Sequence, residues 1–124
     1  MSKPRKVSLT IDNSAAVSDQ FSFDGQRVVG VVTPATWTAA DITFEIEEPT
    51  NTFVKVVDRA GVIYKLAGIA TGVSEYHLVS GDANQADVII TATGNGRVVS
   101  TATATEADEA QGGARTVVIY LADV

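Results

Sequence analysis

The residues Ile42-Thr43-Phe44-Glu45-Ile46-Glu47 decide the fold, because apolar and polar side chains alternate along them without interruption. Successive side chains of a β-strand point to opposite faces, so this pattern predicts a strand with one buried and one solvated face. We expect Ile42, Phe44 and Ile46 to lie in the core. The alternate residues Thr43, Glu45 and Glu47 are predicted to face water, and the turn-forming residues 48–51 end the strand.

Similar alternation recurs on both sides at intervals of about 8–12 residues, which is typical of sandwiches and jelly rolls. The other predicted strands are residues 7–11, 20–23, 27–32, 53–57, 62–66, 75–79, 86–93, 97–105 and 116–121. The predicted core residues are Val7, Leu9, Phe21, Phe23, Ile42, Phe44, Ile46, Tyr76, Leu78 and several of residues 117–121. Residues 36–41 are too few for more than one helical turn. We therefore expect an all-β domain, an antiparallel β-sandwich that is jelly-roll-like and carries a protruding hairpin.

Two segments are typical of hairpin turns. Asp58-Arg59-Ala60-Gly61 joins the strands 53–57 and 62–66, with glycine where a positive φ is needed. Gly94-Asn95-Gly96 joins the strands 86–93 and 97–105. Because the hairpin 86–105 has few large side chains to bury, we expect it to extend from the body and to pack against a neighbouring subunit.

A chain of 124 residues suits one domain that can bury its own core. We predict a flexible basic arm over residues 1–6, followed by a single domain, 7–124, with the extended hairpin 86–105. The absence of cysteine excludes disulfides, thiolate catalysis and cysteine zinc sites. The sequence has no apolar run long enough to cross a bilayer and no signal-peptide core at its start, so we expect no membrane partner.

The formal net charge of −6 disfavours nucleic-acid binding, which needs a positive face. Lys3, Arg5 and Lys6 are three of the nine basic residues. The rest of the chain therefore has six basic residues and fifteen acidic residues. A basic arm therefore precedes an acidic body. The arm is either a frayed terminus or a docking segment that pairs with an acidic patch on a partner.

The titratable residues offer weak candidates for catalysis. His77 is the only histidine, and alternation places it on the solvent side of its strand, without the spaced partners of a catalytic triad or zinc cluster. Glu45 and Glu47 share a face, as the carboxylates of a glycosidase do, but a solvated face explains them better. We predict no catalytic residue, so the protein is not expected to be an enzyme.

Residues 82–87 resemble a calcium loop because oxygen-bearing side chains recur at close spacing. An EF-hand needs glycine at its sixth position and a bidentate acid at its twelfth, where this chain has Asp87 and Thr93. An ordinary loop is favoured over a looser calcium site. We predict no metal and no other cofactor.

Two further features suggest contacts with partners. Thr101, Thr103 and Thr105 alternate with alanines in a row of hydroxyls, which we interpret as a strand that packs against a neighbouring subunit. Trp37, in an apolar connector, either stacks on a sugar or anchors the core. The residues predicted to bind the capsid or further copies of the chain are Lys3, Arg5, Lys6, Trp37, Thr101 and Thr103.

The run Pro34-Ala35-Thr36-Trp37-Thr38-Ala39-Ala40-Asp41-Ile42-Thr43-Phe44 resembles the Pro-Ala-x-Trp-Thr-Ala-Ala-x-Leu-Thr-Phe run of a family of small virion proteins from tailed bacteriophages. Further matches lie in residues 18–33, at 57–58, 61 and 80–81, and in 111–121, so the resemblance covers most of the chain. The chain departs from the family in residues 45–49 and in the hairpin 86–105. The resemblance implies a β-sandwich that decorates or cements a capsid and has no catalytic residues.

Together these observations predict a decoration or cement protein on the capsid surface of the virion, made in the cytoplasm of a bacterial host. Its expected partners are the major capsid protein and further copies of itself, with a trimer matching local three-fold axes. The alternatives are a tail, connector or head-fibre component, or a module that binds a host glycan through Trp37 and nearby tyrosines.

Overall fold

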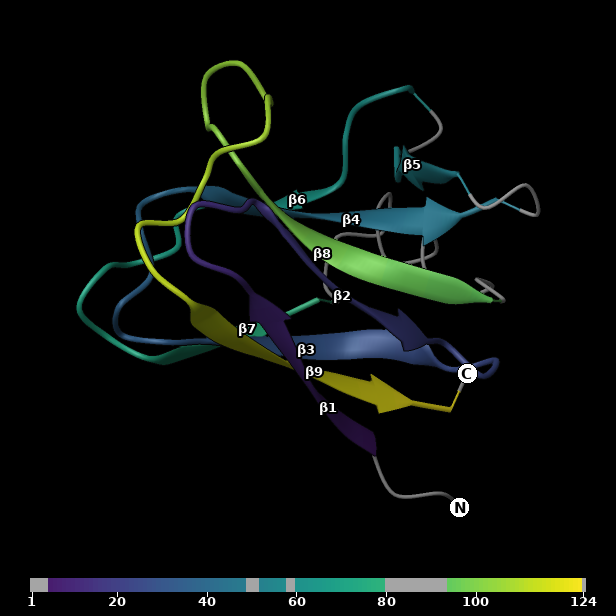
Figure 1. The fold of residues 1–124 in the computed structure, drawn as a ribbon. Helices are drawn as coiled ribbons and strands as arrows, with labels where there is room; N and C mark the ends of the chain where they lie inside the picture. Colours follow the sequence, from purple (N-terminus) through teal and green to yellow (C-terminus); the bar gives the residue numbers. More distant parts are fainter. Residues whose placement is uncertain (1–4, 49–51, 58–59, 80–93, 124) are drawn as a thin grey trace.

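The computed structural model describes residues 5–48, 52–57, 60–79 and 94–123. These residues form nine strands and no helix, so the prediction of an all-β chain is confirmed for them. The strands are β1 (Arg5–Ile11), β2 (Val17–Ser22), β3 (Arg27–Thr33), β4 (Asp41–Glu47), β5 (Phe53–Lys55), β6 (Lys65–Leu66), β7 (Glu75–Leu78), β8 (Asn95–Thr101) and β9 (Arg115–Ala122) (Figure 1). The predicted strand 86–93 lies outside the described residues.

The strands form one antiparallel sheet in the order β5-β4-β8-β2-β1-β9-β3-β7, with β6 paired to β4. The backbone pairing of β1 with β2 is limited to Ile11 and Ser18, and the sheet turns there. It curls into a half-barrel with two parts, β1-β9-β3-β7 and β2-β8-β4 with β5 and β6, which we call the β9 half and the β8 half (Figure 1). This single curled sheet confirms the antiparallel all-β class but not a sandwich or a jelly roll.

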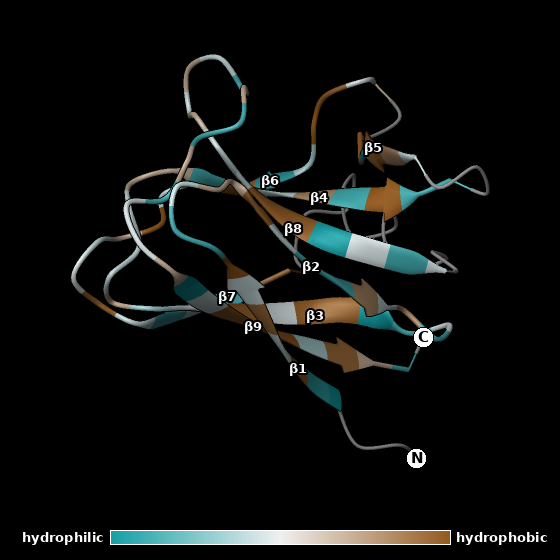
Figure 2. Cartoon of the chain, in the orientation of Figure 1, coloured by the Kyte–Doolittle hydropathy of each residue, from teal (hydrophilic) through white to brown (hydrophobic). Residues whose placement is uncertain are grey.

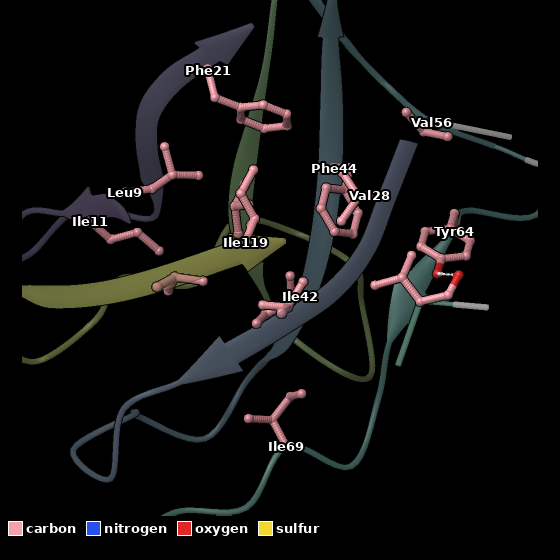
Figure 3. Close-up of a cluster of buried hydrophobic side chains, with 14 of the residues drawn as sticks. Leu9, Ile11, Phe21, Val28, Ile42, Phe44, Val56, Tyr64, Ile69 and Ile119 are labelled. Carbon is pink, nitrogen blue, oxygen red and sulfur yellow. Dashed lines mark hydrogen bonds between the residues drawn. The ribbon is translucent and has the colours of Figure 1, made fainter. Parts of the chain in front are cut away.

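The core lies between the two halves (Figure 3). Trp37, Phe23 and Phe44 are its largest buried side chains. The Phe44 and Tyr64 rings lie 5.8 Å apart between centroids, and the Tyr64 hydroxyl donates a 3.3 Å hydrogen bond to the Val79 carbonyl oxygen. Burial of these apolar side chains from both halves is the main force that holds the curled sheet together.

Most of the predicted core is confirmed. The buried members are Leu9, Phe21, Phe23, Ile42, Phe44, Val117, Ile119 and Leu121. Val7 and Ile46 are partly buried and pack against this cluster. The alternation of β4, β1 and β9 therefore identified their core-facing residues correctly.

β7 presents the opposite face from the one predicted. Tyr76 and Leu78, expected in the core, are 49% and 69% exposed. His77, expected in water, has a side chain that is 17% exposed. The register of β7 on β3 explains the inversion, because it places His77 opposite Val31, which is fully buried on the core side.

β8 is not part of a protruding hairpin. It lies inside the sheet, paired with β4 on one side and β2 on the other. Val98, Val99 and Ser100 are fully buried. The prediction is wrong for this strand because small and β-branched side chains suit a central strand that is covered on both faces. The rest of the predicted hairpin, 86–93, lies outside the described residues.

The hairpin predicted over residues 53–57 and 62–66 is formed only near its turn. Val57 and Ile63 make an isolated antiparallel bridge, and Gly61 has the expected positive φ of 80°. The outer segments, β5 and β6, instead pair separately with β4. Val57 and Ile63 thus pair across the predicted turn, whereas β5 and β6 pair with β4 and not with each other.

Candidate functional site

Trp37 is an anchor of the core. It is fully buried, and its indole Nε1 donates a 3.1 Å hydrogen bond to the Ala40 carbonyl oxygen. The prediction of a partner-binding Trp37 is wrong, and its alternative, a core anchor, is confirmed. Ala40, Ile42 and Phe44 are buried as well, so the run 34–44 contributes mainly to the core.

Gln111 holds the connector between β3 and β4 in place. Its side chain is buried, and its Nε2 donates to the Thr38 carbonyl oxygen (3.1 Å) and to Ser100 Oγ (2.9 Å). Its Oε1 accepts from the Thr38 backbone N–H (2.8 Å) and from Arg115 Nε (3.3 Å). Residues 111–115 of the phage-like pattern therefore join the connector to β8 and β9.

The predicted row of threonine hydroxyls is not formed. β8 ends at Thr101, which is 1% exposed and donates from Oγ1 to Thr43 Oγ1 at 3.2 Å. Residues 103–105 form a turn, and Thr103 Oγ1 donates to Asp41 Oδ1 at 3.1 Å. The predicted role of Thr101 in partner binding is wrong because the side chain is buried, and Thr103 is engaged within the chain.

Paired charges cover the outer side of β4 and β8. Arg97 donates from Nε to Glu45 Oε1 at 2.7 Å, and its Nη2 lies 2.7 Å from the same oxygen. Lys55 Nζ lies 3.6 Å from Glu45 Oε2 and 3.4 Å from Asp108 Oδ1. Glu45 is therefore buried, as is Thr43, and the prediction that both face water is wrong.

A second set of charges surrounds Asp41. Its Oδ2 lies 3.7 Å from Lys65 Nζ, which in turn lies 4.0 Å from Glu106 Oε2. Asp41 Oδ2 accepts no hydrogen bond from the described residues, although its side chain is only 4% exposed. The loop after β8 thus covers the outer side of the β8 half with acids that face Lys55 and Lys65.

Arg5 and Lys6 belong to β1, so the predicted flexible arm does not extend to residue 6. Arg5 binds the turn between β2 and β3, donating to Gln26 Oε1 (3.0 Å), Asp24 Oδ2 (3.1 Å) and the Ser22 carbonyl oxygen. Its guanidinium is used inside the fold. Lys6 is exposed, and Lys3 lies outside the described residues.

His77 has polar neighbours but no metal cluster around it. Its Nε2 lies 3.4 Å from Thr33 Oγ1 and 3.7 Å from Glu75 Oε1. Across the four described ranges, no group of three or more His, Asp or Glu side chains could hold a metal ion. The calcium-like loop 82–87 lies outside these ranges.

An exposed apolar surface lies on the side of the β9 half that faces away from the core, which we call the outer face. Paired residues of neighbouring strands share a face, so the register defines its members. They are Lys6 and Ser8 of β1, Val118 and Tyr120 of β9, Gly30 and Val32 of β3, and Tyr76 and Leu78 of β7. Figure 2 shows the largely apolar character of β3 and β9, the central strands of this half.

Tyr76 and Tyr120 form the centre of the outer face. Their ring centroids lie 5.3 Å apart and the rings are tilted by 52°. Both rings come from strands that flank β3, and Gly30 of β3 gives them room, because a Cβ at that position would overlap the Tyr76 ring. Glycine inside an apolar strand marks a close approach of this kind, and it was the one sequence signal for this site.

The outer face is suited to contact with another protein. Tyrosine supplies a large apolar area together with a hydroxyl group, and exposed tyrosines are enriched in protein interfaces. Lys6 lies directly opposite Tyr120 and adds a positive charge beside the rings. Sequence reasoning missed this surface because Tyr76 and Leu78 were assigned to the core and Tyr120 was not singled out.

Comparisons of the chain with protein-family models, with curated proteins and with solved structures find no match. Within the residues that the structure describes, there is no helix long and apolar enough to cross a membrane. The outer face is therefore the feature on which a functional proposal can be built.

Proposed function

We propose that the chain is a bacteriophage capsid decoration protein, which stabilises the assembled head by bridging capsid subunits. Its location would be the capsid surface of the virion, after synthesis in the cytoplasm of the bacterial host. The partners are the major capsid protein and further copies of the chain, without nucleic acid, membrane or cofactor. The role is one of binding, without catalysis.

The observation that carries this proposal is the outer face. Exposed apolar patches on a soluble protein are typical of interaction sites, and here two large side chains, Tyr76 and Leu78, are among the most exposed apolar residues described. The core side of the same strands is fully buried at Val31, Val117 and Ile119, so the backbone of the face is held in place before it binds. Many such weak contacts, repeated over a shell, stabilise the assembled state by mass action.

The resemblance to small phage virion proteins also supports the proposal, and the residues that carry it lie mainly in the core. Trp37, Ala40 and Phe44 of the phage-like run are buried, so a shared run would indicate a shared fold more directly than a shared binding surface. A jelly-roll-like sandwich stays part of the proposal, with the β9 and β8 halves as its two layers. A structure that includes residues 80–93 would test this finer description.

Self-association also belongs to the proposal, with the trimer expected from the match to local three-fold axes. The hairpin 86–105 was expected to pack between subunits. Thr101 and the rest of β8 are instead central to the sheet. β8 therefore does not supply the contact between copies.

The other candidate structural roles differ from capsid decoration in the location of the protein in the virion and in its copy number. A tail, connector or head-fibre component would be present in few copies, whereas a decoration protein is present in hundreds. The glycan-binding alternative loses its main residue, because Trp37 is fully buried. We therefore retain the tail or connector role as the second candidate.

Quantitative mass spectrometry of separated heads and tails tests the location. Recovery with the heads, at a copy number comparable to that of the major capsid protein, supports decoration, while recovery with tails contradicts it. Rebinding to heads stripped of the protein then tests the site. Tyr120→Glu should bind at least about tenfold more weakly, because it places a charge at the centre of the outer face. Val54→Glu, on β5 of the other half, is the matched control and should bind like the parent.

A further inference from the structure

We propose that two copies of the chain associate edge to edge through β7, so that their β9 halves become one continuous sheet. This inference rests on the self-association included in the proposed function. The occupant of the β7 edge is a second copy of this chain.

β7 is the last strand of the sheet, and among the described residues it pairs with β3 alone. The backbone N–H of Val79 donates to the Val29 carbonyl oxygen at 3.1 Å, which fixes the hydrogen-bonding phase of this antiparallel pair. In an antiparallel ladder, every second residue of a strand directs its backbone N–H and C=O groups toward the same neighbour. Since Val79 is bonded to β3, His77 and Glu75 also direct their backbone groups toward β3. Tyr76 and Leu78 direct theirs toward the open edge.

Among the described residues nothing pairs with the outer edge of β7. Lysine, proline and bulges often protect natural edge strands from pairing, and Glu75–Leu78 contains none of these three. Its two edge-facing residues, Tyr76 and Leu78, are also its exposed apolar residues. Backbone groups and apolar side chains are thus both available along the same short strand.

The polar residues of β7, Glu75 and His77, complement each other in an antiparallel pair of copies. If Tyr76 lies opposite Tyr76 of the second copy, Glu75 lies opposite His77 of that copy, twice. Glu75 and His77 already lie 3.7 Å apart within one chain, so each ring in the pair would have a carboxylate on both sides. A carboxylate directly facing an imidazole, which can donate a hydrogen bond to it, favours this register over one that places His77 opposite His77.

A two-fold axis perpendicular to the sheet relates the copies in this arrangement, so the outer face of each copy stays on the same side. The Tyr76 rings of the two β7 strands then face each other, and the outer faces of both copies form one wider apolar surface. The interface itself is small, since a four-residue edge buries less than the about 1,200 Å² of a standard interface. Association should therefore be weak in solution and become significant at the high local concentration of a shell.

Sedimentation velocity over a concentration series tests the proposal, together with amide hydrogen exchange. The parent should shift from monomer to dimer as its concentration rises, and exchange of the Tyr76 and Leu78 amides should slow while that of His77 stays constant. Leu78→Pro removes one edge-facing N–H and keeps the hydrogen bonds to β3. It should weaken association by at least about tenfold, since it removes backbone bonds and apolar contact together.

Leu78→Lys provides a second test that does not depend on tolerance of proline. It places a charge at the edge and should weaken association similarly, whereas Val54→Lys, on the β5 edge, should associate like the parent. A parent that stays monomeric at every concentration would overturn the proposal, as would Leu78→Lys associating like the parent. A protein that decorates heads as a monomer refutes this inference alone, and a dimer that is absent from heads refutes the decoration role alone.

Discussion

Arg97 of β8 and Glu45 of β4 lie directly opposite each other in the sheet, and their side chains meet at 2.7 Å on the outer side of the β8 half. The same guanidinium lies 4.1 Å from the centroid of the Phe53 ring. Arg97 therefore joins three strands, because Phe53 belongs to β5, which pairs with the other edge of β4. An interaction between two facing residues thus covers the face of β4 that the sequence predicted to be solvated.

Replacing Arg97 should destabilise the fold, because Glu45 is buried and Arg97 is its closest cationic partner. Arg97→Met keeps the packing against Phe53 but leaves Glu45 with Lys55 as its remaining cation, so it should lower the free energy of unfolding by about 1–3 kcal/mol. Arg97→Met combined with Glu45→Leu should recover part of this loss, since it removes both charges. Urea unfolding of the parent, the two single variants Arg97→Met and Glu45→Leu, and the double variant measures the coupling, and a coupling near zero would show that the pair contributes nothing.

Phe44→Ala should lower the free energy of unfolding by about 3–5 kcal/mol, because it leaves a cavity at a fully buried position between the two halves. Val57→Ala removes an apolar side chain that is largely exposed, and it is expected to change stability little. Thermal unfolding followed by circular dichroism compares the two. Equal midpoints for both variants would contradict the described core.

Gln111→Met should destabilise the chain although it preserves size and removes no apolar contact. The Thr38 N–H and carbonyl groups would each lose a partner, at a cost of about 1–3 kcal/mol for a buried polar group left unpaired. The same substitution at Gln20, which is exposed on β2, is the control and should be nearly neutral. Chemical denaturation would contradict this role if both methionine variants matched the parent.

Arg5→Ala and Lys6→Ala separate folding from attachment. Arg5 holds the turn between β2 and β3, so Arg5→Ala should lower the free energy of unfolding by about 1–2 kcal/mol. Lys6→Ala should leave stability unchanged and weaken binding to heads, most visibly at low salt, where an exposed charge is least screened. Full binding of Lys6→Ala across a salt titration would show that this lysine does not contribute to attachment.

Gly30→Ala should separate the two tyrosine rings, because the added Cβ would occupy the position of the Tyr76 ring. The Tyr76 side chain can swing toward solvent, so the loss of stability should stay below the about 1–3 kcal/mol of a true overpacking mutation. Ring proton shifts of Tyr120 in NMR spectra report the loss of contact. In a Tyr76→Ala background, Gly30→Ala should change these shifts little, and an equally large change there would contradict the mechanism.

Much of the fold could be predicted from local pattern. The alternation of Ile42, Thr43 and Phe44 identified β4 and its core face, since the period of a strand is a local property. The pattern could not show that Thr43 is buried too, because its neighbours, Lys65 of β6 and Thr101 of β8, are distant in sequence. Burial on the second face depends on the tertiary arrangement.

The candidate site was harder to predict than the strands. Alternation placed Tyr76 and Leu78 on one face of β7 but could not say which face the core would take. That choice is made by the register on β3, where His77 meets Val31. Trp37 and Thr101 were candidates for contact because of their residue types, yet long-range packing buries both. Residue type indicates what a side chain can do, and the fold decides whether it is accessible.

The pairing of β1 with β9 constrains the order in which the chain can fold. Arg5 lies opposite Leu121, so the first described strand has its long partner at the other end of the chain. A growing polypeptide emerges from the ribosome N-terminus first, and β1 must wait there until β9 has been synthesised. Contacts of such high sequence separation also slow folding, because a large loop has to close before they form. The half-barrel can therefore be completed only after β9 has emerged, so the first described strand is among the last to find its long partner.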